Sequence, residues 1–165
     1  MTGRVCLALA LAVALYGIAA SLAGAATGRR RLVDSGRRAV YALAALLTVA
    51  FATLEVAFAR CDLSYALVAE HASRTTPLFY RVTAVWSAQE GSLLLWVWLL
   101  SLWSSLAVRA TRRTLREAAP YAQATLLGFA AFFCGLAAFL ADPFGRCTRR
   151  RWRASGSPRS CATRA

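Results

Sequence analysis

The sequence predicts an all-α integral membrane protein, with four transmembrane helices and an external aromatic-rich segment between the second and third helices. Three observations carry this prediction. The 165-residue chain is 59% apolar, which excludes a disordered protein and exceeds the usual composition of a soluble domain. Its apolar residues form long, almost uncharged runs. Its 20 basic side chains, all arginine, outnumber the 7 acidic ones and cluster between or after these runs.

Each of the four runs is of a length that can cross a bilayer. They cover residues 5–27, 39–59, 92–108 and 118–141, and the charged side chain within them is Glu55. Because an α-helix rises 1.5 Å per residue, roughly 20 residues span a hydrocarbon layer of ~30 Å. We therefore expect one transmembrane helix over each run.

The first run also resembles a secretory signal, since Arg4 precedes it and the small residues 23–25 are typical of a cleavage site. The run is longer than the usual apolar core of about 7 to 15 residues. Three consecutive arginines, residues 29–31, follow it directly, as at the cytoplasmic end of an anchor. These two features favour a helix that is retained in the protein.

Small residues predict where the helices approach one another closely. They recur at intervals of three and four residues on the first run, at Gly17, Ala20, Ser21 and Gly24. Such a stripe allows another helix backbone to come near. Gly128 and Gly135 lie seven residues apart on the fourth run, and we expect them to serve interhelix packing as well.

The arginines predict the orientation. Residues 28–38 and 109–117 together hold nine arginines, whereas residues 60–91 hold three and also Asp62, Glu70 and Glu90. Arginines near helix ends resist translocation, so the two dense connections should be cytoplasmic. The amino terminus, residues 60–91 and the chain after residue 141 are then external. Since topology accounts for the basic residues, we do not expect a nucleic-acid partner.

The external segment is rich in aromatic side chains. Four of the five tryptophans, residues 86, 96, 98 and 103, fall at its end or just after it. They are typical of an interfacial belt, because an indole has an apolar body and a polar edge. The alternative is a patch that stacks against a large, flat, apolar ligand. Composition alone leaves both interpretations open.

A family resemblance favours the second interpretation. The string at residues 86–96, Trp-Ser-Ala-Gln-Glu-Gly-Ser-Leu-Leu-Leu-Trp, follows Thr-Pro-Leu-Phe-Tyr-Arg at residues 76–81, and Asp-Pro-Phe stands at residues 142–144. With these motifs the chain resembles the amino-terminal part of the CcmF family of cytochrome c-type biogenesis proteins, which are haem lyase subunits of the CcmF/CcsA haem-handling membrane proteins. The resemblance covers nearly all of the hydrophobic region.

The resemblance implies a role in cytochrome c maturation. It implies a multipass protein of the bacterial plasma membrane with an external amino terminus, as the arginine count also predicts. The expected partners are the lipid bilayer, haem, apocytochrome c and other cytochrome maturation membrane subunits. The alternative is a small multipass scaffold or interaction subunit without haem chemistry.

The resemblance also implies candidate contacts on the haem side, at Trp86, Glu90, Gly91 and Trp96. It implies no haem bound by this chain alone, because the family's ligand histidines are missing and Gln89 stands where many relatives carry histidine. The five cysteines form no Cys-x-x-Cys pair, so no metal site is expected. We identify no catalytic residue, and whether the chain acts as an enzyme stays open.

Two further ionisable residues have alternative roles. The sole histidine, His71, stands in the external segment, where we expect a solvated surface group rather than an axial ligand. Glu55 lies about 7 Å from the external end of its run by the helical rise, so it can reach the interface. A role for Glu55 in the haem pathway is the alternative.

The carboxy-terminal stretch differs from the rest of the chain. We divide the sequence into a CcmF-like membrane region, residues 1–145, and a tail, residues 146–165, that has seven arginines and no acidic residue. Because such a tail is expected on the external side, it opposes the usual charge bias. We expect it to be disordered or translated out of frame. The alternative is a basic arm that contacts anionic lipid headgroups.

Overall fold

The computed structural model describes residues 2–60, 67–68, 79, 83, 89–111, 118–141 and 143–145. Most of the predicted external segment, including Trp86 and His71, lies outside the described residues. The same holds for the predicted tail, residues 146–165, so the proposed boundary after residue 145 stays a prediction.

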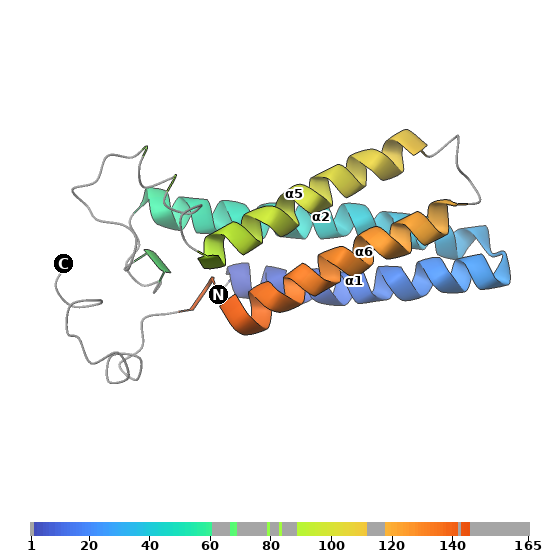
Figure 1. Cartoon of the computed structure of the whole chain (residues 1–165), viewed down its shortest axis with the longest axis horizontal. Coiled ribbons are helices and arrows are strands. Elements are labelled where there is room, and N and C mark those ends of the chain that lie inside the picture. Colours follow the sequence, from blue (N-terminus) through green and yellow to red (C-terminus); the bar gives the residue numbers. More distant parts are fainter. Residues whose placement is uncertain are drawn as a thin grey trace.

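Four long helices account for most of the described chain (Figure 1). They are α1 (Thr2–Thr27), α2 (Arg30–Ala59), α5 (Gln89–Thr111) and α6 (Ala119–Leu136), and a short π-helix, η1 (Ala137–Ala141), continues α6. All four are long and apolar enough to cross a membrane, counting α6 together with η1. The described residues contain no strand. The predicted all-α class with four membrane-spanning helices is therefore confirmed.

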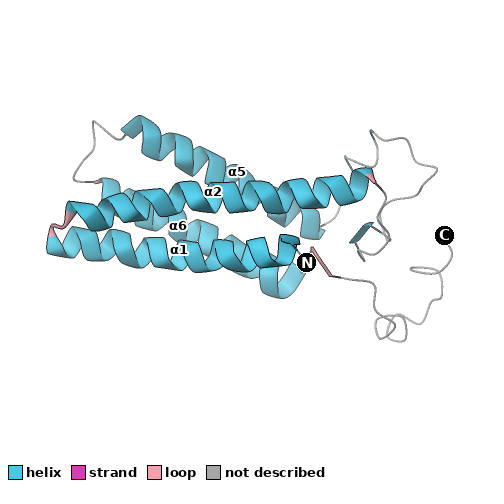
Figure 2. Ribbon diagram, turned by 180° about the vertical axis from the view of Figure 1, so that it is seen from behind, coloured by secondary structure: helices cyan, strands magenta, loops and turns pink. Residues whose placement is uncertain are grey.

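The helices run alternately up and down (Figures 1 and 2). Helix α1 packs against α2 and α6, and α5 packs against the same two neighbours, so α1 and α5 lie on a diagonal of the bundle. The connection between α1 and α2 lies at the same end as the last turn of α5 and the first turn of α6. The opposite end holds the start of α1, the end of α2 and the start of α5.

The connection between α1 and α2 is much shorter than the arginine-rich stretch, residues 28–38, that was expected to form it. Helix α1 ends at Thr27, and Gly28 adopts φ +65°, the left-handed conformation that commonly follows a helix and that glycine adopts without strain. Helix α2 then begins at Arg30, so residues 30–38 are helical rather than part of a loop. Arginine is a good helix former, and this segment can turn its charges outward. Helix α2 thus extends ~13 Å beyond its apolar run.

The small residues of α1 do allow close packing. A Cβ atom added at Gly17 would lie 2.6 Å from Cδ1 of Leu127 on α6 and 2.8 Å from Cβ of Ala39 on α2. One added at Gly24 would lie 2.8 Å from the backbone nitrogen of Val33. The predicted stripe on α1 is therefore confirmed as a helix-packing surface.

The same prediction was wrong for the two glycines of α6. Among the described residues, a Cβ atom at Gly128 or Gly135 would meet no atom within 4 Å. The buried residues of α6, such as Leu127, Ala131 and Cys134, occupy the positions that face α1 and α5. Spacing alone did not reveal which side of α6 turns inward, because both sides are apolar.

Apolar side chains cover the outside of the bundle as well as its interior. The interior is formed mainly by fully buried leucines and Phe58 of α2, with Leu7, Leu43, Leu47, Leu54, Leu94 and Leu127. The outer surface exposes aromatic rings on α6, among them Tyr121, Phe129 and Phe132. This pattern is typical of a helix bundle surrounded by lipid, where the outside need not be polar.

The chain after η1 returns to the beginning of α1. Phe144 is 4% exposed, and its ring occupies the space that a side chain at Gly3 would need. The predicted Asp-Pro-Phe motif therefore has a packing role through its phenylalanine. Asp142 lies outside the described residues.

Candidate functional site

The tryptophans of α5 do not form one surface. Trp96 and Trp103 are 64% and 67% exposed, and they share one outward face because they stand seven residues apart. Trp98 lies about 160° away from Trp96 around the helix and is partly buried. The predicted patch therefore separates into two indoles that are exposed on the outward face of α5 and one that joins helices.

Trp98 fixes α5 to α2. Its ring stacks on that of Phe51, with centroids 4.6 Å apart and planes inclined by 8°. Its Nε1 donates a hydrogen bond of 3.0 Å to Oγ1 of Thr48, and that hydroxyl donates in turn to the carbonyl oxygen of Ala44 at 2.7 Å. An indole packed between helices usually finds such a partner for its N–H group. Because both contacts come from one indole, they determine the register between the two helices.

Glu90 and Gly91 lie in the first turn of α5. Gly91 is buried and Glu90 is half-buried, on a side of the helix more than about 100° from Trp96. A carboxylate is favourable at this position because the first turn of a helix carries partial positive charge. The structure thus places Glu90 and Gly91 on the more buried side of the start of α5 and Trp96 on its exposed side. Trp86 lies outside the described residues, so whether the four share a ligand surface stays a prediction.

Glu55 belongs to the same junction between α2 and α5. It stands one helical turn beyond Phe51, on the flank of α2 that faces α5 and toward the end where α5 begins. Its side chain is half-buried, and within the described part of the chain no hydrogen bond or ion pair reaches its carboxylate. The structure therefore leaves both predicted roles of Glu55 open.

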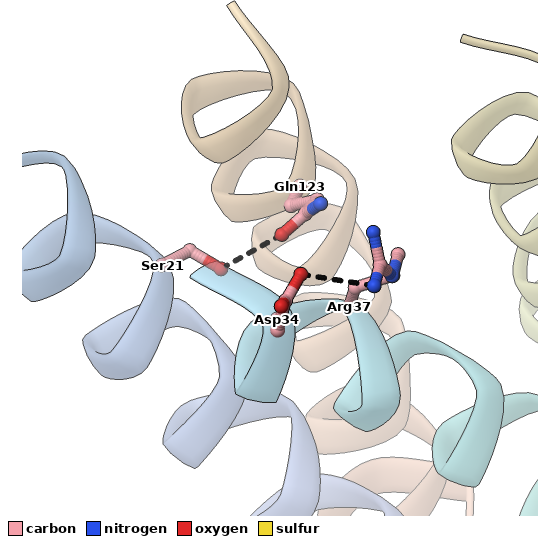
Figure 3. A network of polar contacts seen from close by, with 4 residues as sticks. All are labelled: Ser21, Asp34, Arg37 and Gln123. Atoms are coloured by element: carbon pink, nitrogen blue, oxygen red, sulfur yellow. Dashed lines mark hydrogen bonds and ion pairs between the residues drawn. The ribbon is translucent and has the colours of Figure 1, made fainter. Parts of the chain in front are cut away.

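A polar contact joins three helices at the arginine-rich end (Figure 3). Ser21 of α1 donates to Oε1 of Gln123 of α6 over 3.4 Å, and these side chains are 0% and 3% exposed. Gly36 of α2 faces them and leaves room for the serine hydroxyl. Beside this contact, Asp34 and Arg37 of α2 form an ion pair of 2.9 Å. Polar side chains buried in this way hold membrane helices together.

Sequence analysis did not find the contacts of Trp98 or Gln123. Thr48 and Phe51 stand three residues apart on a helix, which places them on one face. Nothing in the sequence shows that Trp98, 47 residues after Phe51, reaches that face. Only the pairing of α2 with α5 reveals it.

The described residues include no histidine that could serve as an axial ligand to a haem iron. No group of three or more His, Cys, Asp or Glu side chains is close enough to hold a metal within the described ranges. Cys6 and Cys134 are buried free thiols in the interior of the bundle. Among the described residues, Glu55 and Glu90 are the carboxylates nearest the junction of α2 and α5, and carboxylate is not one of the usual axial ligands of haem.

These features define a multipass membrane protein in which α5 exposes two indoles on its outer face and is joined to α2 by a third indole, that of Trp98. No family model matches the chain. It is 36% identical to the cytochrome c-type biogenesis protein CcmF of Haemophilus influenzae, over 144 residues that make up 87% of this chain and 22% of that protein. It is 33% identical to CcmF of Escherichia coli (strain K12), also over 144 residues and the same shares of the two chains.

A solved structure agrees with these relatives. It is described as cytochrome c heme lyase CcmF, matches with a TM-score of 0.81 at 33% identity, and covers 93% of this chain and 26% of its own. The chain therefore belongs to the CcmF family of cytochrome c-type biogenesis proteins. It spans about a fifth of the length of the curated relatives named above, 22% in each case. The family resemblance expected from the sequence is confirmed.

Proposed function

We propose that this chain is the amino-terminal membrane region of a CcmF-type haem lyase and that it serves cytochrome c maturation. The observation that carries the proposal is the match to the haem lyase structure at TM-score 0.81 and 33% identity, over 93% of the chain. A likeness of this extent includes the order and packing of all four helices.

The orientation follows from the arginines. Arg29, Arg30 and Arg31 at the first connection and Arg109 at the end of α5 all stand at one end of the bundle. In the proposed topology this end is cytoplasmic, because arginines near helix ends are retained on that side. The amino terminus and the start of α5 are then external, at the surface where apocytochrome c and the other maturation subunits are met.

The proposed role of the chain is structural support for the haem-handling surface. Haem iron is commonly held by axial histidine, and the described residues include none, so no step of the chemistry is assigned to them. Trp96 offers an exposed aromatic face near the external end of α5, suited to contact a flat apolar ligand or an apolar protein segment. Glu90 and Gly91 form the neighbouring helix start, and Trp86 is the fourth proposed contact.

A chimera tests this function. In an Escherichia coli strain without its own CcmF, the matched segment of that CcmF is replaced by residues 1–145 of this chain. Holocytochrome c is then measured by haem-peroxidase staining. We expect the chimera to restore holocytochrome c. A chimera that accumulates in the membrane at the normal level and yields none would contradict the proposal and favour a scaffold without haem chemistry.

The proposed contact at Trp96 has a matched control in Trp103. Both indoles lie on the outward face of α5, but Trp103 is ~10 Å further from the external end. In the chimera, Trp96→Ala should lower holocytochrome c at unchanged protein level, whereas Trp103→Ala should not. Equal losses from both substitutions would indicate a general packing role against the rest of the lyase.

A further inference from the structure

The first turns of α2 carry more positive charge than the described acidic side chains neutralise. Residues 28–38 hold five arginines and one acidic residue, Asp34. Asp34 is engaged by Arg37 at 2.9 Å. Arg30, Arg31 and Arg38 are exposed, and among the described residues no ion pair involves them. Among the described residues, therefore, no acidic side chain pairs with these three guanidinium groups.

These three side chains share one side of a rigid helix. At 100° per residue, Arg30, Arg31 and Arg38 fall within an arc of about 100°, and this arc is opposite the buried face that contains Gly36, Val40 and Leu43. We call Arg30, Arg31 and Arg38 the basic face. Because residues 30–38 are helical, these charges keep a fixed spacing, which a loop would not provide.

An apolar strip continues from the basic face. After Arg38, toward the carboxy-terminal end of α2, the same side of the helix exposes small aliphatic side chains over four turns: Ala42, Ala45, Val49, Ala52 and Val56. Tyr41, 39% exposed, stands at the change from charged to apolar residues, where a phenol is typical of the headgroup level. A soluble acidic partner would use the charges but not this strip. A phospholipid would use both.

We propose that the basic face binds the phosphate of an anionic phospholipid, whose acyl chains lie along the Ala–Val strip of α2. Arginine suits this ligand because its planar guanidinium donates two parallel hydrogen bonds to phosphate oxygens. Basic residues at the membrane surface also attract anionic lipid electrostatically. The basic face lies ~15 Å along α2 from Thr48 of the Trp98 junction, and the proposal does not depend on the proposed haem-related function.

Native mass spectrometry of the full chain in neutral detergent tests the proposal. The ligands are phosphatidylglycerol and, with matched acyl chains, phosphatidylcholine. We expect phosphatidylglycerol to bind at least ~10-fold more tightly, because each surface arginine contributes roughly a fivefold preference for anionic lipid. The variant Arg30→Gln/Arg31→Gln/Arg38→Gln should abolish this preference and leave phosphatidylcholine binding unchanged. Unchanged preference in that variant would overturn the proposal.

A matched pair of single variants separates the site from net charge. Arg38→Gln and Arg60→Gln remove the same charge from opposite ends of α2, and both arginines are exposed. We expect Arg38→Gln to weaken phosphatidylglycerol binding ~5-fold and Arg60→Gln to have no effect. Equal losses would show a non-specific charge effect and contradict the site.

Two further arms complete the test. Should the triple variant lose its helical circular dichroism, Arg38→Gln is compared with Arg38→Lys, which keeps the charge and should retain most of the preference. Inorganic phosphate is added as a competitor. Displacement of phosphatidylglycerol by millimolar phosphate would indicate a site for the free anion and overturn the lipid assignment.

Discussion

Gly36 of α2 leaves the space that the hydroxyl of Ser21 of α1 occupies. A Cβ atom at Gly36 would overlap Oγ of Ser21 and would lie 3.3 Å from Oε1 of Gln123. The absence of a side chain at this one position therefore allows three helices to meet around a buried hydrogen bond. The sequence drew attention to Ser21 as part of a small-residue stripe, but not to its partner glycine.

Gly36→Ala should destabilise the bundle by about 1–3 kcal/mol, because overpacking forces neighbouring atoms apart. The measurement is unfolding of the purified protein by increasing SDS in mixed micelles. Gly128→Ala is the matched control, since a Cβ there meets nothing within 4 Å. Alanine also has the higher helix propensity, so the control should be neutral or slightly stabilised.

The second-site change Ser21→Ala tests the cause of that loss. It removes the hydroxyl with which the new methyl group collides, at the cost of the bond to Gln123. We expect Gly36→Ala/Ser21→Ala to be more stable than Gly36→Ala alone. A double variant in which the two losses simply add would show that the clash is not with Ser21.

Trp98→Phe should cost about 1 kcal/mol, because the ring can still stack on Phe51 while the hydrogen bond to Thr48 is lost. Trp98→Ala should cost about 3 kcal/mol or more, since it also leaves a cavity. Thr48→Val removes the same hydrogen bond from the other partner. In a double-mutant cycle, Trp98→Phe and Thr48→Val should be less costly together than the sum of the single losses. Strict additivity would contradict the contact.

The three indoles of α5 should differ in their contact with lipid. In vesicles of brominated phospholipid, variants that retain a single tryptophan should show strong fluorescence quenching at Trp96 and Trp103, because both are exposed on the outer face. A variant that retains Trp98 should be quenched less, since that ring is covered by Phe51. Equal quenching at all three positions would mean that α5 does not pack on α2 as described.

The fold class could be predicted because the bilayer sets the length of apolar sequence that a spanning helix needs. Runs of apolar residues as long as 5–27 or 118–141 have few alternatives to a spanning helix. The first residue of each helix was harder to predict from the sequence. Arg30 lies in a charged stretch that has the composition of a loop, yet α2 begins there because arginine is a good helix former.

The packing faces could be predicted only where the two sides of a helix differ in size. On α1 the stripe with Gly17 and Gly24 was found because small residues face the neighbours. On α6 both sides are apolar, and Gly128 was assigned to a helix contact that the described residues do not make. The candidate contacts Trp96 and Glu90 came from the family resemblance, which says nothing about direction, and helix geometry turns them to different sides of α5.

The central claim is that the start of α5 and the arginine-rich end of the bundle lie on opposite sides of the membrane, with the start of α5 outside. It is tested most directly in intact cells with a membrane-impermeant thiol reagent. Gln89→Cys and Thr27→Cys, both at exposed positions, are introduced separately after the native cysteines are replaced by serine. We predict that Gln89→Cys is labelled in intact cells and that Thr27→Cys is labelled only after the membrane is permeabilised. The opposite pattern, or labelling of both positions from the same side, would contradict the account.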